Sequence, residues 1–246
     1  MRALTMSSRL YREDLAHVHA TGFSRFGVTS THEIVRLLRA RGIRNGDVVE
    51  LGCGAGALAR VLCSAGFGVI GVDASAAMIA RARAVAPRAR FRRASVYDVE
   101  LAPCVAVTAI GEVLSYVSGG PRSVRRARLF RRVARSLAPR GLFVLDVLVA
   151  GEPPMSYRTF TRGRDWFVLV DVTEHRGRAR VRREITTLVR DGRAYRERSE
   201  VHVLEVFRAA RLVRELERAG FAVETSRAYG RVRLPERRLA FIARKR

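Results

Sequence analysis

The sequence predicts an α/β fold with a mostly parallel sheet, helices between its strands, and an antiparallel β cap inserted after the fifth strand. Short apolar runs alternate with amphipathic helical patterns between residues 47 and 150, as in a parallel sheet with helical crossovers. The first apolar run leads into a glycine-rich turn, Gly52–Gly56. Between residues 151 and 207 the apolar period becomes two, which is typical of antiparallel strands.

Residues 1–46 precede this core and have a helical pattern. Thr31 is expected to cap a helix that runs to Ala40 and ends at Gly42. The core itself, residues 47–150, is predicted to alternate regularly, so that the carboxyl ends of its strands meet at one edge of the sheet. Its predicted order is strand Val48–Leu51, helix Ala57–Ala65, strand Val69–Asp73, helix Ser75–Val85, strand Ala89–Ala94, strand Val105–Ile110, helix Ser123–Leu137 and strand Leu142–Val149.

Residues 151–207 are predicted to form a cap of three antiparallel strands. Their apolar residues alternate with polar ones, beginning at Trp166 and Val168. The dipeptide Asp191-Gly192 is a tight-hairpin signal between the second and third strands. Residues 208–246 are expected to complete the core with helix Arg208–Ala219 and strands Ala222–Tyr229 and Leu239–Arg244.

The glycine turn and the acid at the end of the second strand together predict an adenosine-type ligand. Asp73 lies about 20 residues beyond Gly52, where an acid accepts hydrogen bonds from ribose hydroxyls. Dinucleotide sites use G-x-G-x-x-G, whereas this turn is G-x-G-x-G with Ala57 at the third glycine position. Glu50 would repel a pyrophosphate and suit a cationic amino-acid group. The pattern therefore favours a sulfonium ligand over NAD.

These residues resemble the motifs of class I S-adenosylmethionine-dependent methyltransferases. Glu50–Gly56 resembles the first motif, Val72-Asp73 the second, 94–98 the third, and 138–142 the turn before the fifth strand. Ser95 departs from the pattern, because the third motif usually has Asp there. The C-terminal half resembles bacterial small-molecule enzymes that modify natural products and sugars. The resemblance implies a Rossmann-like seven-stranded sheet and an N-terminal helical lid over the cofactor.

The resemblance also assigns site residues. Tyr11 and His19 fall where lid residues would lie, with a packing aromatic and a surface histidine as the alternatives. Tyr116 is expected to line the substrate cavity together with His19 and Glu112. The residues expected to bind S-adenosylmethionine are Glu50, Gly52, Cys53, Gly54, Gly56, Asp73, Ala74, Met78, Ser95, Val96, Gly111 and Tyr11.

Two residues are the candidates for acid–base catalysis. Glu112 follows the fourth strand, next to the expected methyl site, and it is either a polar contact or base there or a carboxylate bound to loop backbone. His202 lies on the third cap strand, where histidine is frequent in the similar enzymes; its alternative is a sheet histidine with satisfied hydrogen bonds. The segment Ile110–Glu112 lacks the Asp/Asn-Pro-Pro-Tyr/Phe motif of many base N-methyltransferases, which argues against that activity.

The net charge of +24 indicates attraction to polyanions without indicating a specific nucleic-acid site. Lys245 is the only lysine among 47 basic residues, and arginines occur from Arg2 to Arg246. Such a skew is typical of a GC-rich genome, whereas a nucleic-acid surface would gather lysines and stacking aromatics in one patch.

Cysteine use and hydropathy favour a reduced, cytoplasmic protein. Cys53, Cys63 and Cys104 have neither paired nor metal-ligand spacing, and the histidines form no ligand cluster, so no metal is expected. No apolar run approaches the length of about 18 residues that would suggest a membrane span, and the N-terminus lacks the apolar core of a signal peptide.

The predicted function is methyl transfer from S-adenosylmethionine to O or N of a small molecule, by a monomer or homodimer. Direct displacement at a sulfonium methyl requires positioning and removal of a proton, without a metal. The sequence leaves two alternative functions open: an RNA methyltransferase that uses the arginine-rich surface, and a non-catalytic protein that binds the cofactor.

Overall fold

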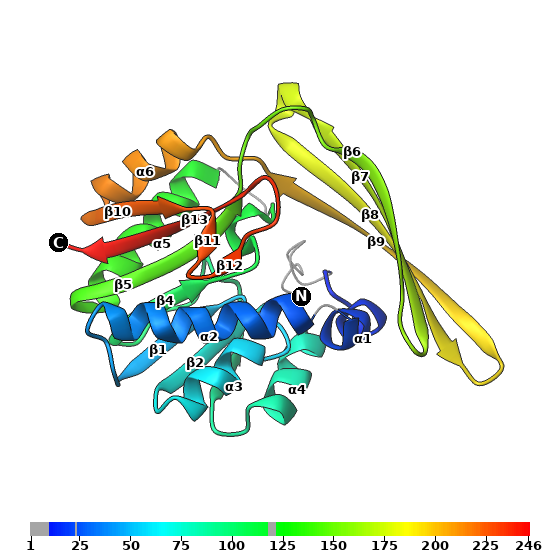
Figure 1. Cartoon of the computed structure of the whole chain (residues 1–246), viewed down its shortest axis with the longest axis horizontal. Coiled ribbons are helices and arrows are strands. Elements are labelled where there is room, and N and C mark those ends of the chain that lie inside the picture. Colours follow the sequence, from blue (N-terminus) through cyan, green and yellow to red (C-terminus); the bar gives the residue numbers. More distant parts are fainter. Residues whose placement is uncertain (1–9, 23, 118–121) are drawn as a thin grey trace, which may run out of the picture.

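The computed structural model describes residues 10–22, 24–117 and 122–246, which form a central seven-stranded sheet with helices on both faces (Figure 1). The strand order is β10-β13-β5-β4-β1-β2-β3, and β13 runs antiparallel to both of its neighbours. The mostly parallel α/β sheet that the sequence predicts is confirmed. The strands are β1 (Asp47–Leu51), β2 (Gly68–Asp73), β3 (Arg90–Arg93), β4 (Cys104–Ala109), β5 (Leu137–Leu148), β10 (Phe221–Ser226) and β13 (Arg238–Lys245).

Apolar helix stripes cover the two faces of this sheet. On one face, Ile34 of α2 and Leu62 of α3 belong to a buried cluster with sheet residues such as Val48. On the other face, Phe130 of α5 and Leu216 of α6 belong to a second buried cluster that is built on β1, β4 and β5. Each stripe buries one side of an amphipathic helix, which is what stabilises helices of this length in a protein. These helices are α2 (Ser24–Ala40), α3 (Ala57–Ser64), α4 (Ala76–Val85), α5 (Arg122–Ser136) and α6 (Ala209–Arg218).

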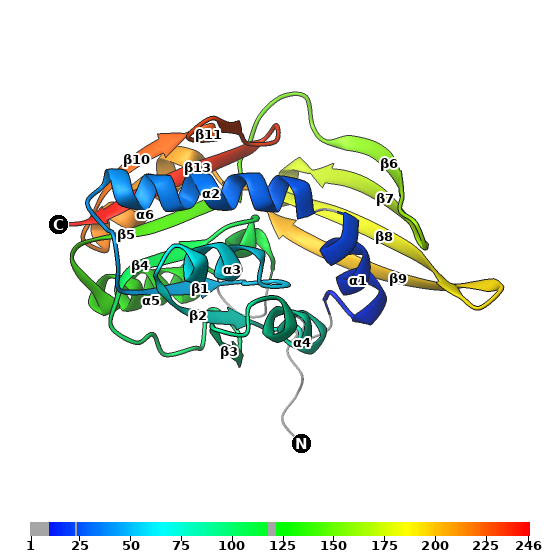
Figure 2. The same cartoon turned by 60° about the horizontal axis from the view of Figure 1, so that its bottom comes forward.

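The segment inserted between β5 and α6 forms a separate antiparallel sheet that projects from the core as a twisted wing (Figures 1 and 2). It contains four strands rather than the predicted three. The extra strand, β6, carries almost wholly exposed side chains, so it lacks the apolar alternation that marks a half-buried strand. The order is β6 (Ser156–Arg162), β7 (Trp166–His175), β8 (Arg180–Asp191) and β9 (Ala194–Glu205).

Helix α1 (Glu13–Gly22) packs on the cap (Figure 2). Its Leu15 and Val18 share a buried cluster with Trp166, Val168 and other cap residues. Asp14 is buried and accepts charge-assisted hydrogen bonds from Arg196 of β9. The N-terminal segment is therefore attached to the cap by apolar burial and by a buried carboxylate.

Several predicted boundaries are wrong. Helix α2 begins at Ser24, so Thr31 lies buried inside the helix and does not cap it. Strand β5 begins at Leu137, because that residue pairs with Cys104 ahead of an irregularity in the ladder. The predicted strand 222–229 is divided into β10 and a two-residue strand. The remaining short elements are β11 (Ala228–Tyr229), β12 (Val232–Arg233) and the 3-10 turns η2 (Val113–Ser115) and η3 (Arg176–Arg178).

Candidate active site

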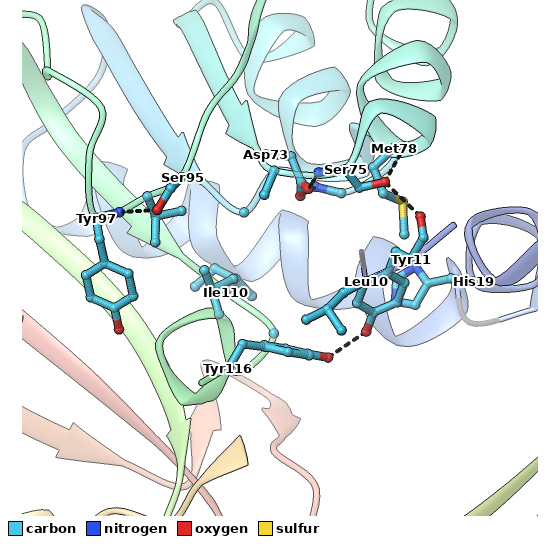
Figure 3. Close-up of a pocket in the computed structure, with 16 residues that line it drawn as sticks. Leu10, Tyr11, His19, Asp73, Ser75, Met78, Ser95, Tyr97, Ile110 and Tyr116 are labelled. Carbon is cyan, nitrogen blue, oxygen red and sulfur yellow. Dashed lines mark hydrogen bonds between the residues drawn. The ribbon is translucent and has the colours of Figure 1, made fainter. Parts of the chain in front are cut away.

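A pocket opens beyond the carboxyl ends of β1, β2 and β4, where ligands bind in open parallel sheets (Figure 3). The structure brings most of the predicted site residues to its wall, from the glycine turn, the end of β2, the loop after β4 and the N-terminal segment. The predicted residues that line it are Tyr11, His19, Gly52, Gly54, Asp73, Ala74, Met78, Ser95, Val96, Gly111 and Tyr116.

Five further residues line the pocket that sequence reasoning did not assign. Ser75 had a local signal, because it is a serine at the expected start of a helix, and it caps α4 by accepting a hydrogen bond from the Met78 N–H. The other four have uncharged side chains, and they reach the pocket only because of how the loops fold. Their residue types therefore gave no signal in the sequence. The five are Leu10, Ser75, Tyr97, Ile110 and Val113.

Asp73 ties the glycine turn to the end of β2. Its Oδ2 accepts a hydrogen bond of 2.9 Å from the Gly54 N–H, and its Oδ1 accepts one of 2.8 Å from the Ser75 N–H. Burial raises the pKa of Asp73 above its ordinary value, although these N–H groups oppose the shift because they stabilise the charged form. The carboxylate therefore faces the pocket in a fixed orientation.

The third glycine of the turn serves helix packing rather than the pocket. Gly56 has φ +83°, and a Cβ built there would lie 2.9 Å from the Cα of Ala82 in α4. Gly56 is also absent from the pocket wall among the described residues, as is Cys53, whose side chain is buried. Two of the predicted cofactor-binding residues thus support the turn from behind.

Glu50 is a buried carboxyl directly behind the glycine turn. Its Oε2 has no hydrogen-bond partner in the part of the chain that the structure describes. Burial, and secondly the nearby charge of Asp73, raises the pKa of Glu50 to about 8, while the Ala59 N–H opposes this. A buried carboxyl oxygen without a partner is costly, and a cation in the pocket would favour the ionised form of Glu50.

Tyr11 and Tyr116 meet at one end of the pocket (Figure 3). Their hydroxyl oxygens lie 2.6 Å apart. Burial raises the pKa of both phenols, so both are neutral at ordinary pH. His19 packs edge-on against the Tyr11 ring, with 5.4 Å between the ring centroids. The hydroxyl pair offers neutral donors and acceptors at this end of the pocket.

His202 lies behind the tyrosine pair and does not line the pocket among the described residues. Its ring is fully buried, with its centroid 5.0 Å from that of Tyr11 and 5.7 Å from that of Tyr116. Its Nε2 is 2.9 Å from Oε2 of Glu200, and its Nδ1 has no partner in the described structure. His202 therefore contacts the pocket only through the two aromatic rings.

Glu112 is not among the described residues that line the pocket. Its Oε2 accepts a hydrogen bond of 3.0 Å from Arg183 of β8, and its Oε1 lies 3.6 Å from Nε of Arg238 in β13. Its own N–H donates to the buried carboxylate of Asp146. Both carboxylate oxygens of Glu112 therefore lie near arginines of β8 and β13. The prediction that Glu112 contacts substrate or acts as a base stays a prediction.

The described residues contain no group of three or more His, Cys, Asp or Glu side chains arranged to hold a metal ion. Within the same ranges, no helix has the length and apolar character needed to cross a bilayer.

Comparison with known proteins identifies the core. A family model described as "Methyltransferase domain" matches residues 48–141, which include β1, the glycine turn, Asp73 and the loop after β4. No curated protein matches the sequence.

Solved structures match nearly the whole chain. DesVI from Streptomyces venezuelae has a TM-score of 0.80 at 20% identity, covering 96% of this chain and 100% of its own. The sugar N-methyltransferase KedS8 from Streptoalloteichus has a TM-score of 0.75 at 24% identity, covering 95% and 92%. An S-adenosylmethionine-dependent methyltransferase from Clostridium acetobutylicum has a TM-score of 0.80 at 16% identity, covering 94% and 97%. Residues 48–141 therefore match a methyltransferase domain, and the chain has the fold of S-adenosylmethionine-dependent methyltransferases.

Proposed function

We propose that this chain transfers a methyl group from S-adenosylmethionine to a small molecule, and that the favoured acceptor is the amino nitrogen of a sugar. The observation that carries the cofactor is the buried carboxyl of Glu50, whose Oε2 has no partner among the described residues, behind a pocket that also presents Asp73. The choice of acceptor draws on the fold, because KedS8 is described as a sugar N-methyltransferase and CalS10 as an amino pentose methyltransferase.

The pocket chemistry fits this cofactor. The carboxyl of Glu50 suits the cationic amino group of a methionine moiety and disfavours a pyrophosphate. Asp73 holds both carboxylate oxygens in fixed positions, and each retains acceptor capacity for a ribose hydroxyl. Small and apolar surface for the adenine ring of the cofactor comes from Ser95, Val96 and Met78. S-adenosylmethionine, when bound, supplies a methyl group already activated on a positively charged sulfur.

The two paired tyrosines of the pocket favour nitrogen over oxygen as the acceptor atom. Along the described wall, the titratable groups are Asp73, His19 and three tyrosines. Tyr11 and Tyr116 are neutral phenols, so they orient an acceptor without deprotonating it. An amine that enters unprotonated attacks with its own lone pair and loses its proton afterwards, whereas a hydroxyl needs a base during the attack. His202 remains the candidate base for a hydroxyl acceptor.

The cofactor assignment is tested by calorimetric titration with S-adenosylhomocysteine. Asp73→Ala should weaken binding at least tenfold, about 1.4 kcal/mol. Asp171→Ala is the matched control, because Asp171 lies on the cap and outside the described pocket wall. Equal affinity of Asp73→Ala and the wild type would remove Asp73 from the site.

The acceptor is tested by mass spectrometry on pairs of sugars that differ only in an amino or a hydroxyl group at one carbon. We expect the mass gain of one methyl group on the amino member of a pair alone. Methylation of the hydroxyl member alone would overturn the nitrogen assignment, and cofactor binding without turnover on any acceptor would support the non-catalytic alternative.

A further inference from the structure

Glu200 makes an unusual set of contacts for a residue on the cap. It is buried on the inner face of β9, and its two oxygens accept three hydrogen bonds. Oε2 accepts from the Tyr11 N–H at 2.7 Å and lies 2.9 Å from His202 Nε2, and Oε1 accepts from the Arg12 N–H at 2.8 Å. One cap carboxylate therefore holds two consecutive backbone groups of the N-terminal segment.

Those two N–H groups belong to the turn that starts α1. The carbonyl of Arg12 accepts the first helical hydrogen bond, from Ala16, so Arg12 occupies the N-cap position. Tyr11 has φ +52°, a conformation that is uncommon for a residue with a side chain. A carboxylate at this position accepts hydrogen bonds from free N–H groups, and its negative charge interacts favourably with the positive end of the helix dipole. Glu200 thus satisfies the N-cap N–H from another element, as the N3 side chain of a capping box does within one helix.

Tyr11 is also tied to the core. Its carbonyl accepts a hydrogen bond of 2.7 Å from the Ser75 hydroxyl, and the Ser75 N–H donates to Asp73, which in turn accepts from Gly54. Four consecutive hydrogen bonds therefore run from Glu200 on the cap, through Tyr11 and Ser75, to Asp73 and the glycine turn. Every link has a donor–acceptor distance between 2.7 and 2.9 Å.

We infer that Glu200 is a positioning residue that holds Tyr11 across the pocket and thereby couples the cap to retention of the cofactor. This inference rests on the proposed function, because it places the cofactor in the pocket whose wall includes Tyr11. A segment held at Tyr11 by the cap, by Ser75 and by Tyr116 must release at least one of these contacts before a ligand beneath it leaves. Removing the carboxylate should therefore accelerate ligand release.

The primary test uses Glu200→Gln, which keeps the shape of the side chain but leaves one acceptor oxygen where there were two. Glu197→Gln is the matched control, since Glu197 lies on the same strand, exposed on the opposite face. Stopped-flow displacement of S-adenosylhomocysteine should show release about tenfold faster or more in Glu200→Gln, because hydrogen bonds to charged groups are the stronger ones. Glu197→Gln should match the wild type.

A second measurement needs no ligand. Trypsin cleaves after arginine, and Arg12 lies in the turn that Glu200 holds. Cleavage at Arg12 should be faster in Glu200→Gln than in the control while both proteins remain folded. Should Glu200→Gln fail to fold, Glu200→Asp keeps the charge on a shorter side chain, and it should show the same two effects to a smaller degree.

The inference is overturned if folded Glu200→Gln releases the ligand and is cleaved at Arg12 at control rates. A purely structural role would lower the melting temperature and leave the release rate unchanged. Failure of the proposed function is distinguishable, because the wild type would then bind no S-adenosylhomocysteine in the calorimeter, while the cleavage difference at Arg12 would persist.

Discussion

The hydroxyl oxygens of Tyr11 and Tyr116 lie 2.6 Å apart, although 105 positions separate the two residues in the chain. Both rings also pack against His202 of the cap. The N-terminal segment, the loop after β4 and the inner cap strand therefore converge at one end of the pocket. We propose that the acceptor binds at this end of the pocket, where three distant parts of the chain meet.

Replacing Tyr116 by Phe should impair turnover more than cofactor binding. The variant leaves the Tyr11 hydroxyl without its partner, which should cost about 0.5–1.5 kcal/mol of stability. We expect kcat to fall about tenfold while the affinity for S-adenosylhomocysteine stays within about twofold, because the hydroxyl pair orients the acceptor. Tyr195→Phe, which removes an exposed hydroxyl on the outer cap face, is the control. Wild-type turnover by Tyr116→Phe would exclude this role.

Cofactor binding should release a proton from Glu50. Its pKa is raised to about 8 in the free protein, so the carboxyl is protonated at pH 7. A cationic amino group in the pocket favours the ionised form, so binding should expel this proton and should tighten as pH rises toward 8. Calorimetry in buffers of different ionisation enthalpy measures the release. Glu50→Gln should release none, and an equal release by both proteins would contradict the assignment.

The same residue should affect stability in a predictable direction. The folded-state pKa of about 8 lies above the usual value near 4.3, so the folded protein binds the extra proton between about pH 4.3 and 8. The contribution of Glu50 to the free energy of unfolding therefore falls as pH rises through that window. In thermal melts, the melting temperature of Glu50→Gln should rise relative to that of the wild type between pH 5 and pH 8. A constant difference across this range would contradict the shift.

Two glycine variants separate backbone strain from packing. Gly56 and Gly66 both have positive φ, but a Cβ at Gly66 meets open space, whereas one at Gly56 would lie 2.9 Å from Ala82. Gly66→Ala should lower the free energy of unfolding by about 1 kcal/mol, because of the strained conformation alone. Gly56→Ala should lower it by at least about 1 kcal/mol more, because α4 must move. Urea denaturation measures both, and equal costs would mean that the helix contact is not tight.

Glu112→Gln should lower stability and leave the pH profile of turnover unchanged. The substitution removes the negative charge that partners Arg183 and, more distantly, Arg238. Unpaired buried charges are costly, so the melting temperature should fall. Loss of a general base typically lowers kcat by about a hundredfold to ten thousandfold. A fall of that size in the folded variant would restore Glu112 as the base.

The sequence predicted that the glycine turn and Asp73 lie at one edge of the sheet, because the signals for this arrangement are local. The glycine turn and Asp73 each follow an apolar strand, and parallel strands end at the same edge of a sheet. Thr31 misled the prediction, since a threonine ahead of an apolar stripe is a common N-cap, whereas α2 continues upstream to Ser24.

The contacts around the tyrosine pair could not be predicted from local sequence signals. Glu200 and Glu197 occupy the same strand, and only the register of β9 against β8 decides which of them faces inward. The contact between Glu200 and Tyr11 spans 189 positions, so no spacing in the sequence marks it. His202 was singled out for its chemistry, but its position behind two tyrosine rings depends on how the cap docks on the N-terminal segment.

The cap leaves and rejoins the core at one place. Val149 and Phe207 form an isolated bridge, and the Phe207 N–H donates to the Leu148 carbonyl at 2.8 Å. A short peptide joining these two points would close the core without reordering its strands. However, α1 would lose its contacts with Trp166 and neighbouring cap residues. An experiment that exchanges caps between related enzymes must therefore transfer the N-terminal segment as well, because the cap and α1 pack together as one unit made of two separate pieces of chain.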